Sequence, residues 1–517
     1  MKMSNLFAPT IKEAPKGIVD QGILRLIRGA FVNRASSQSS LGLLPLGVAL
    51  FERVSGKVEE LFDASAFQQV DFYDFFGQAL EVASGFVKSY RQLPLTFYQK
   101  KNRVYEVLGF TELQEQAEEL IGNFCEKFSE SFLKLGFSVK KKVSLNDGFE
   151  SLDLVTFVEK SFPYAESAYY CTNCSWCGWE DSPVKQEVAS QDEEPKDLEV
   201  VDTPGADTIV ELCNQLGVSP ENTIKTMFYV AEGEDKKEVF VVLVRGDHKI
   251  SEEKVKRAIG CSAIRFADPL EIKETVGDLA GYLGPVGLPK KLKVIADFHV
   301  RGIINAVVGA NQPEKHMLNA CWGRDFTATQ VEDLIIYERK MKCPICSSDL
   351  DVRPFAKVAS FSSDAGYLTN GKGISYQGKQ GKVEEAHLWK GEIYLEPLAL
   401  SLVKPNGPLP FGVAPFDVSI IVPSVRNKEA LALGGKLEEA LDNEGFNVLL
   451  DDRDERAGVK FSDAELLGSP VTVICGKMSA EGIVELSYPD GSKRECKVED
   501  VVKEVRNVIC TKCGEDK

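Results

Sequence analysis

The sequence has no apolar run long enough to span a membrane, and its first residues, MKMSNLFAPTIKEAP, lack the apolar stretch of a signal peptide. These two absences predict a cytoplasmic protein without a membrane partner. Hydrophobic residues make up 44% of the 517 positions and charged residues 27%, a balance that is typical of globular chains. The length is enough for three or more domains of ordinary size.

A surplus of positive charge is also missing. The formal net charge is −17, which argues against a protein that binds nucleic acid through a generally basic surface. A local basic groove can still contact phosphates while the remaining surface is acidic. The charge therefore leaves a nucleic-acid partner open, provided that the contact is local.

The cysteines do not suggest a disulfide framework. Their number is 13, which is odd, and several stand in Cys-x-x-Cys pairs. Such pairs in a large chain favour reduced thiols and a bound metal.

Apolar spacing divides the chain into regions. Residues 1–170 read mainly as helices with a few strands, and the acidic stretch 185–199 is typical of a solvated linker. Residues 201–332 mix helices with β-rich runs, which indicates an α/β or α+β region. From Pro410 onward strand and helix patterns alternate, which predicts a small parallel or mixed sheet with helices on it.

Short motifs stand out between residues 203 and 325. They are ENTIKT around Lys225, VRGDH ending at His248, AGYLGPVGLP around 281–285, VIAD ending at Asp297 and GANQPEKH ending at His316. In this order they resemble the editing insertion of bacterial-type prolyl-tRNA synthetases. The resemblance implies hydrolysis of alanine wrongly esterified to proline tRNA, that is, of Ala-tRNA(Pro).

The resemblance also implies roles for particular residues in a reaction that needs neither a protein nucleophile nor a metal. Lys225 would engage the tRNA 3′ end, the loop 281–285 would bring glycine N–H groups close to the ester, and His316 would line the alanine pocket. The full set implied for catalysis is Lys225, Gly281, Gly284, Pro285, His316, Asp297 and Thr203. The structural alternatives are an exposed lysine, an ordinary Gly/Pro turn, a structural histidine, and a hydrogen bond from Asp297 at a strand end.

The C-terminal region resembles the anticodon-binding domain of class IIa synthetases. The similar segments are PFGVAPFDVSIIVP at 410–423 and LLDDRDERAGVKFSDAELLGSPVTVICGK at 449–477. This resemblance implies tRNA binding, with Arg456 and Lys460 as candidates for phosphate or anticodon contact. For Arg453, Asp463 and Glu465 a structural ion network is the alternative.

The segments FAPTIKEAP, LPLGVALFERV and SYRQLPLTFYQ resemble the core of the same synthetases, but the family's ATP-handling motifs are degraded. The motif 1 proline and the Thr-x-Glu loop are absent from 72–94. Most of the motif 2 loop is missing, with Arg103 and Glu106 displaced. Glu396 stands where motif 3 has an arginine, and its carboxylate would repel ATP phosphates. We therefore expect that ATP binding is lost, while the core still supports a homodimer.

The resemblances together predict a multidomain α/β and α+β protein: a degenerate class II core with an antiparallel sheet, an inserted α/β editing domain and an α/β anticodon-binding domain. The expected boundaries are 1–180 for the first part of the core, 181–200 for the linker, 201–332 for the editing insertion, 333–405 for the second part of the core, 406–509 for the anticodon-binding domain and 510–517 for the tail.

The cysteine pairs flank the predicted insertion. An inserted domain has its two ends close together, which would bring Cys174 and Cys177 beside Cys343 and Cys346. Four thiolates from two such turns form a tetrahedral structural zinc site. A third pair, Cys510 and Cys513, could replace one of these pairs, and unliganded thiols are the alternative to zinc.

Three functions remain open at this level. The favoured one is an editing deacylase that acts on mischarged proline tRNA without ligase activity. The second is a divergent but active proline–tRNA ligase, and the third is a non-catalytic tRNA-binding or regulatory protein. Retention of Lys225, the 281–285 loop and His316 favours the first over the third.

Overall fold

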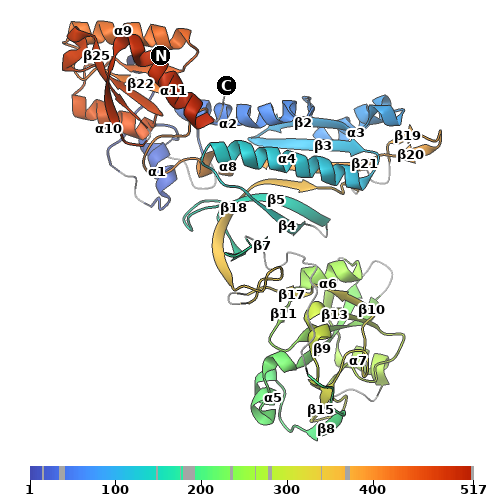
Figure 1. The fold of residues 1–517 in the computed structure, drawn as a ribbon. Coiled ribbons are helices and arrows are strands. Elements are labelled where there is room, and N and C mark those ends of the chain that lie inside the picture. Colours follow the sequence, from blue (N-terminus) through green and yellow to red (C-terminus); the bar gives the residue numbers. More distant parts are fainter. Residues whose placement is uncertain are drawn as a thin grey trace. The chain divides into compact units, whose positions relative to one another are not determined.

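The computed structural model describes residues 1–13, 15, 17–33, 41–146, 149–174, 176–178, 193–232, 237–261, 263–277, 282–338, 341–366, 373–488 and 490–513. The chain divides into two compact units (Figure 1). Unit 1 comprises Met1–Lys141, Leu152–Glu166 and Pro354–Lys517, and unit 2 comprises Lys142–Ser151 and Ser167–Arg353. Within the described ranges, no helix has the length and apolar character that a membrane span requires.

The first part of unit 1 is built on a largely antiparallel sheet. Its strands follow the order β1-β2-β3-β21-β18-β5, and only the β1–β2 pair is parallel. Their bounds are Gln68–Gln69 (β1), Leu95–Lys101 (β2), Val104–Thr111 (β3), His387–Tyr394 (β21), Leu350–Ser362 (β18) and Phe149–Phe157 (β5).

Helices α2 (Pro45–Asp63), α4 (Gln114–Lys134) and α8 (Leu395–Ser401) pack with this sheet. Helix α4 buries Phe124, Phe128 and Phe132, which are four residues apart and so lie on one helix face. Phe124 stacks on Phe62 of α2, with ring centroids 5.6 Å apart. These aromatic contacts place the core of this part between the helices and the sheet.

The C-terminal part of unit 1 has a five-stranded mixed sheet in the order β23-β22-β24-β25-β26. The strands are β22 (Val418–Ile421), β23 (Val448–Asp451), β24 (Val471–Ile474), β25 (Ile483–Ser487) and β26 (Lys493–Lys497), and the helices are α9 (Lys428–Asn443), α10 (Ala457–Leu467) and α11 (Val501–Cys513). The first three strands are parallel and the last two are antiparallel. The predicted strand–helix alternation is confirmed.

Unit 2 contains a five-stranded sheet in the order β12-β9-β10-β13-β16 and a smaller sheet in the order β14-β15-β8. Their bounds are Glu199–Asp202 (β8), Ile224–Glu232 (β9), Lys237–Arg245 (β10), Ala263–Phe266 (β12), Lys293–Asp297 (β13), Ala306–Gly309 (β14), Lys315–Ala320 (β15) and Gln330–Glu332 (β16). The helices are α5 (Ile209–Leu216), α6 (Glu252–Ile259) and α7 (Pro269–Val276).

Helix α5 illustrates how the sequence sets these elements. Thr208 and Glu211 form a capping box at its start, and Gly217 ends it in the left-handed conformation. The mixed sheets and the helices of the two units together confirm the predicted α/β and α+β class.

Candidate active site

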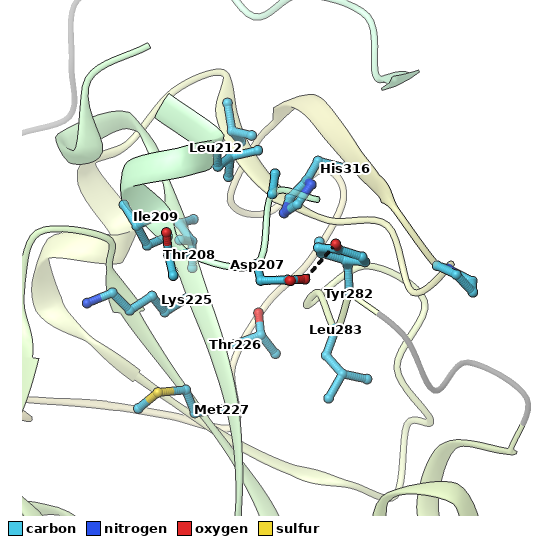
Figure 2. A pocket seen from close by; sticks show the side chains of 15 residues that line it. Asp207, Thr208, Ile209, Leu212, Lys225, Thr226, Met227, Tyr282, Leu283 and His316 are labelled. Carbon is cyan, nitrogen blue, oxygen red and sulfur yellow. Dashed lines mark hydrogen bonds between the residues drawn. The ribbon is translucent and has the colours of Figure 1, made fainter. Parts of the chain in front are cut away.

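A pocket of about 570 Å³ lies in unit 2 among segments that are far apart in the sequence (Figure 2). It is lined by the start of α5, the first residues of β9, the 282–283 loop, β14 and the region around β15. The lining residues are Ala206, Asp207, Thr208, Ile209, Leu212, Ile224, Lys225, Thr226, Met227, Tyr282, Leu283, Val307, Gly309, Pro313 and His316. Lys225 and His316 are thus brought to one pocket.

Lys225 stands near the start of β9, and its side chain is half-buried. Its Nζ donates a hydrogen bond of 2.8 Å to the backbone oxygen of His248. Burial lowers the pKa of the Lys225 ammonium, although the nearby Asp247 carboxylate opposes this shift. The pocket therefore holds a cation that is tethered by one of its three N–H groups.

His316 is held from behind by Thr203. Thr203 Oγ1 lies 2.6 Å from Nδ1 of His316, and both residues are buried. The Thr203 backbone N–H donates to Glu314 O at 2.7 Å, which fixes the hydroxyl group relative to β15. Burial lowers the pKa of His316, so the imidazole is neutral near pH 7. Thr203 itself does not line the pocket; it orients a residue that does.

The loop after Gly281 crosses the end of β14 at very short range; Gly281 itself lies outside the described residues. A Cβ on Gly284 would sit 1.7 Å from Gly309 O, and one on Gly309 would sit 2.2 Å from Leu283 O. Both positions therefore require glycine because the two backbones touch. Gly284 and Pro285 are buried and lie outside the pocket lining, to which the loop contributes Tyr282 and Leu283.

The expectation that Gly284 offers an N–H to the ester needs correction. Its N–H donates to Asn311 Oδ1 at 2.7 Å. Asn311 also donates its Nδ2 to Val286 O at 2.7 Å and its backbone N–H to Tyr282 O at 2.9 Å. It has a φ of 57°, a conformation that asparagine tolerates. Asn311 therefore holds the 282–286 segment in place. The sequence does not predict this role, although Asn311 stands inside the motif GANQPEKH.

Asp297 ends β13 and is not among the residues that line the pocket. Its Oδ1 accepts from the ring and the backbone N–H of His299, at 2.7 and 3.0 Å, and Oδ2 accepts from Leu334 N–H at 3.0 Å. Burial alone would raise the pKa of Asp297, but these hydrogen bonds hold it below its ordinary value. The strand-end alternative therefore describes Asp297 better than a catalytic role.

His248 lies next to this aspartate. His248, Asp297 and His299 could supply a metal with ligand atoms that lie within 4.8 Å of one another. However, the Arg245 guanidinium donates to His248 Nε2 at 2.9 Å, and Asp297 is already bonded to His299. A fixed positive charge beside a ligand nitrogen disfavours a cation, so we treat the group as a hydrogen-bond network.

Four cysteines in unit 2 form a second group of potential metal ligands. Cys171 Sγ is 3.4 Å from Cys346 Sγ, Cys174 Sγ is 3.6 Å from Cys343 Sγ, and all four ligand atoms lie within 4.8 Å of one another. Four thiolates in this arrangement suit a tetrahedral ion such as Zn²⁺.

The ligand set corrects the predicted one, because Cys171 takes the place of Cys177. Three cysteines spaced three residues apart offer two overlapping Cys-x-x-Cys pairs, and spacing alone does not choose between them. In the structure Cys171 N–H donates to Trp176 O at 2.8 Å, so the chain turns back between them. Cys177 lies in strand β7 (Cys177–Gly178), which pairs with β6 (Glu166–Cys171). The side chains of Cys510 and Cys513 are outside the described part.

In the anticodon-binding region, Lys460 is fully buried. Its Nζ donates to Val422 O at 2.7 Å and to Asp451 O at 3.3 Å. A buried ammonium with these partners supports the fold, which corrects the expectation that Lys460 contacts tRNA. Arg456 is exposed at the start of α10 and remains a candidate.

The structural alternative holds for Arg453 and Asp463 in the same region. Arg453 pairs with Asp451 at 2.7 Å and with Asp463 at 2.9 Å. Glu465 uses its backbone oxygen instead, as the acceptor of a 3.2 Å hydrogen bond from Arg25.

The sequence predicts a shortened motif 2 loop after β2, and the connection at this place in the core is short. Strands β2 and β3 are joined by Asn102 and Arg103 alone, with φ values of 49° and 64°, as in a two-residue hairpin turn. Arg103 Nη1 forms an ion pair of 2.8 Å with Glu396 Oε1 in the first turn of α8. Both residues line a pocket of about 580 Å³ together with Tyr164 and Lys357.

Comparison with known proteins finds a family match in unit 2 and another in the C-terminal part of unit 1. Residues 203–326 match the aminoacyl-tRNA editing domain family, and residues 417–508 match the anticodon binding domain family. Over 98% of its length the chain is 27% identical to a proline–tRNA ligase of Geobacillus sp. (strain WCH70), of which it covers 100%, and to one of Thermoanaerobacter sp. (strain X514), of which it covers 99%. It is 28% identical over 98% of its length to a proline–tRNA ligase of Bacillus mycoides (strain KBAB4), covering 100% of that protein.

The fold and these domains define a protein built like an aminoacyl-tRNA synthetase, with an editing domain and a module for tRNA. Within this class, the chain is similar over nearly its whole length to bacterial proline–tRNA ligases, and residues 203–326 match the aminoacyl-tRNA editing domain.

Proposed function

We propose that this protein binds proline tRNA and hydrolyses Ala-tRNA(Pro), and that it does not ligate proline to tRNA. The observation that carries the deacylase proposal is the pocket whose lining includes both Lys225 and a neutral His316 held by Thr203. The pocket volume of about 570 Å³ accommodates an aminoacyl group and part of the terminal nucleotide.

The proposed reaction is the attack of water on the ester carbonyl. Lys225 keeps two N–H groups for the substrate beyond the one given to His248 O, and its charge suits the anionic 3′ end of the tRNA. His316 is neutral and can exchange a hydrogen bond with the acyl group or the water without carrying charge. Leu212, Leu283 and Val307 supply apolar walls, and these favour the small side chain of alanine by excluding a larger ring.

Loss of ligation is supported by the core. The family resemblance implies a long ATP-gripping motif 2 loop after β2; here the chain has the Asn102–Arg103 turn, and Arg103 is paired with Glu396. An arginine that is already paired with a carboxylate has less charge to offer to a triphosphate. The alternative of a working ligase stays open to experiment.

The test uses the purified full chain. Release of alanine from Ala-tRNA(Pro) should exceed that in buffer, release of proline from Pro-tRNA(Pro) should not, and proline-dependent ATP–pyrophosphate exchange should equal the no-enzyme control. Robust exchange would support the ligase instead. If no acyl group is released and no exchange occurs, the non-catalytic tRNA-binding alternative takes their place.

A further inference from the structure

The pocket carries one more charged group that the reaction described so far does not use. Asp207 stands just before α5, and the hydroxyl of Tyr282, 75 residues further along the chain, donates to its Oδ1 at 2.7 Å. Figure 2 shows the two side chains pointing toward each other, with Asp207 between Tyr282 and Lys225 in this view. One pocket is therefore lined by a cation and an anion.

Asp207 is not needed to cap α5. Thr208 Oγ1 accepts from Glu211 N–H at 3.2 Å, and the Glu211 carboxylate accepts from Thr208 N–H at 2.9 Å. The capping box at the start of α5 is thus complete without the side chain of Asp207. Within the described part of the chain, Asp207 Oδ2 has no hydrogen-bond partner, which leaves it free to accept one from a ligand.

The surroundings of Tyr282 favour a positive ligand on this side of the pocket. The hydrogen bond to Asp207 raises the pKa of Tyr282 to about 12, and the charges of Asp207, Glu314 and Glu211 add to this shift. The phenol therefore stays protonated and keeps donating to Oδ1 near pH 7. A carboxylate held by one neutral donor retains its full charge for a second partner.

We propose that Asp207 receives the α-ammonium group of the aminoacyl ester, with Tyr282 holding the carboxylate in place. The inference rests on the proposed deacylase function and specifies its substrate class as tRNA esters with a free α-amino group. Lys225 and Asp207 would then bind opposite ends of the substrate, the anionic tRNA terminus and the cationic amino group. An ester whose amino group is acylated or replaced by a hydroxyl group lacks the charge that Asp207 recognises.

The experiment compares wild type and Asp207→Asn on tRNA(Pro) that carries either an alanyl or a lactyl (2-hydroxypropanoyl) group. We expect Asp207→Asn to slow alanyl release by about 10- to 100-fold, the range of a hydrogen bond to a charged group. Lactyl release should change less than about threefold, because it never had the ammonium group. Comparing the variant with wild type on each ester cancels the different intrinsic reactivities of the two esters.

Two further variants separate recognition from structure. Tyr282→Phe keeps the ring and removes the donor, so it should slow alanyl release by a smaller factor, about 3- to 10-fold, and spare lactyl release. Asp202→Asn is the matched control, since Asp202 is an exposed carboxylate of the same unit that pairs with Lys315 outside the pocket lining. It should leave both rates unchanged.

The outcomes distinguish the inference from the function on which it rests. Equal slowing of both esters by Asp207→Asn, or no slowing of either, overturns the role of Asp207 while the deacylase stands. If wild type releases neither group faster than buffer, the deacylase fails. Binding of 3′-alanylamino-adenosine, an uncleavable amide, then decides the inference: Asp207→Asn should weaken it about tenfold, and equal affinities of variant and wild type overturn it.

Discussion

At the scale of single residues, the candidate site shows how one buried hydrogen bond can set the state of a functional group. Thr203 is fully buried and makes a 2.6 Å hydrogen bond to His316. A histidine that is oriented by a second residue presents the same ring nitrogen to the pocket in every molecule. Thr203 therefore acts on the reaction through His316, as a positioning residue.

Replacement of Thr203 by valine tests this role. Valine keeps the shape and removes the hydroxyl group, so His316 loses its anchor and can rotate. We expect alanine release to fall by about tenfold, the effect of one neutral hydrogen bond, and the ratio of alanine to proline release to fall with it. If Thr203→Val lowers thermal stability but leaves both quantities unchanged, Thr203 is only structural.

We expect His248 to make the stability of unit 2 depend on pH. Burial, the Arg245 guanidinium and His299 lower its folded-state pKa from 6.5 to about 4. Between these values the unfolded chain binds the proton more readily than the folded chain, so stability falls as the pH falls from about 6.5 toward 4. The full shift corresponds to about 2–3 kcal/mol after allowance for coupling to its neighbours.

Hydrogen exchange of the β10 and β13 amides in the full chain measures this effect. The opening free energy of wild type should drop between pH 6.5 and 4.5, and that of His248→Asn should drop distinctly less. Identical slopes for the two proteins would show that other groups control the acid sensitivity.

At the scale of elements, the order of strands and helices was more predictable than the use of individual side chains. The local spacing of apolar residues after Pro410 predicts alternating strands and helices. The structure has this order, with β22, α9, β23, α10 and β24. Buried Lys460 donates to the carbonyl groups of Val422, just after β22, and of Asp451, at the end of β23, and no local pattern encodes such contacts.

The same limit applied to the site itself. The motifs marked Lys225 and His316 as site residues, and the fold places both in the lining of one pocket. The hydrogen bonds of Gly284 to Asn311 and of Tyr282 to Asp207 form only where the 282–285 loop meets the segment after β14 and the segment before α5. Distances between loops are a product of tertiary packing, so the sequence could not supply them.

The cysteine knuckle gives a prediction at this scale. We expect one zinc ion per chain, and we expect Cys171→Ser to lose most of it because Cys171 is one of the four clustered thiols. Cys177→Ser is the matched variant and should retain the metal. Elemental analysis of protein purified without chelators provides the measurement, and equal metal loss from both variants would restore Cys177 to the ligand set.

At the scale of the whole molecule, the pocket of unit 2 and the pocket around Arg103 in unit 1 differ in how well the groups that the family resemblance implies are retained. The pocket of unit 2 has Lys225, Asp207 and His316 in its lining. In the unit 1 pocket around Arg103, the charge of the arginine is paired with the carboxylate of Glu396. A chain that decays without selection should lose both sites at similar rates. A retained editing pocket therefore favours continued use on tRNA, and the expected homodimer stays a prediction.

The link between the anticodon-binding region and the editing pocket can be tested through substrate length. Two modules on one chain that hold one tRNA gain affinity from each other, because the second contact is intramolecular. Alanine on a minihelix that lacks the anticodon arm should be released with a KM about tenfold higher and a similar kcat. Arg456→Ala should raise the KM for full-length Ala-tRNA(Pro) about three- to tenfold, since one phosphate contact is lost, and it should reduce the salt dependence.

The same variant should leave hydrolysis of the minihelix unchanged, because the minihelix has no anticodon arm for Arg456 to contact. Arg494→Ala is the control: Arg494 is an exposed arginine in the same region, paired with Glu504 at 3.3 Å. If Arg456→Ala and Arg494→Ala raise the KM equally, the effect reflects net charge alone. If full-length tRNA and minihelix are hydrolysed with the same KM, the anticodon-binding region takes no part in editing, and the pocket of unit 2 recognises the acceptor end by itself.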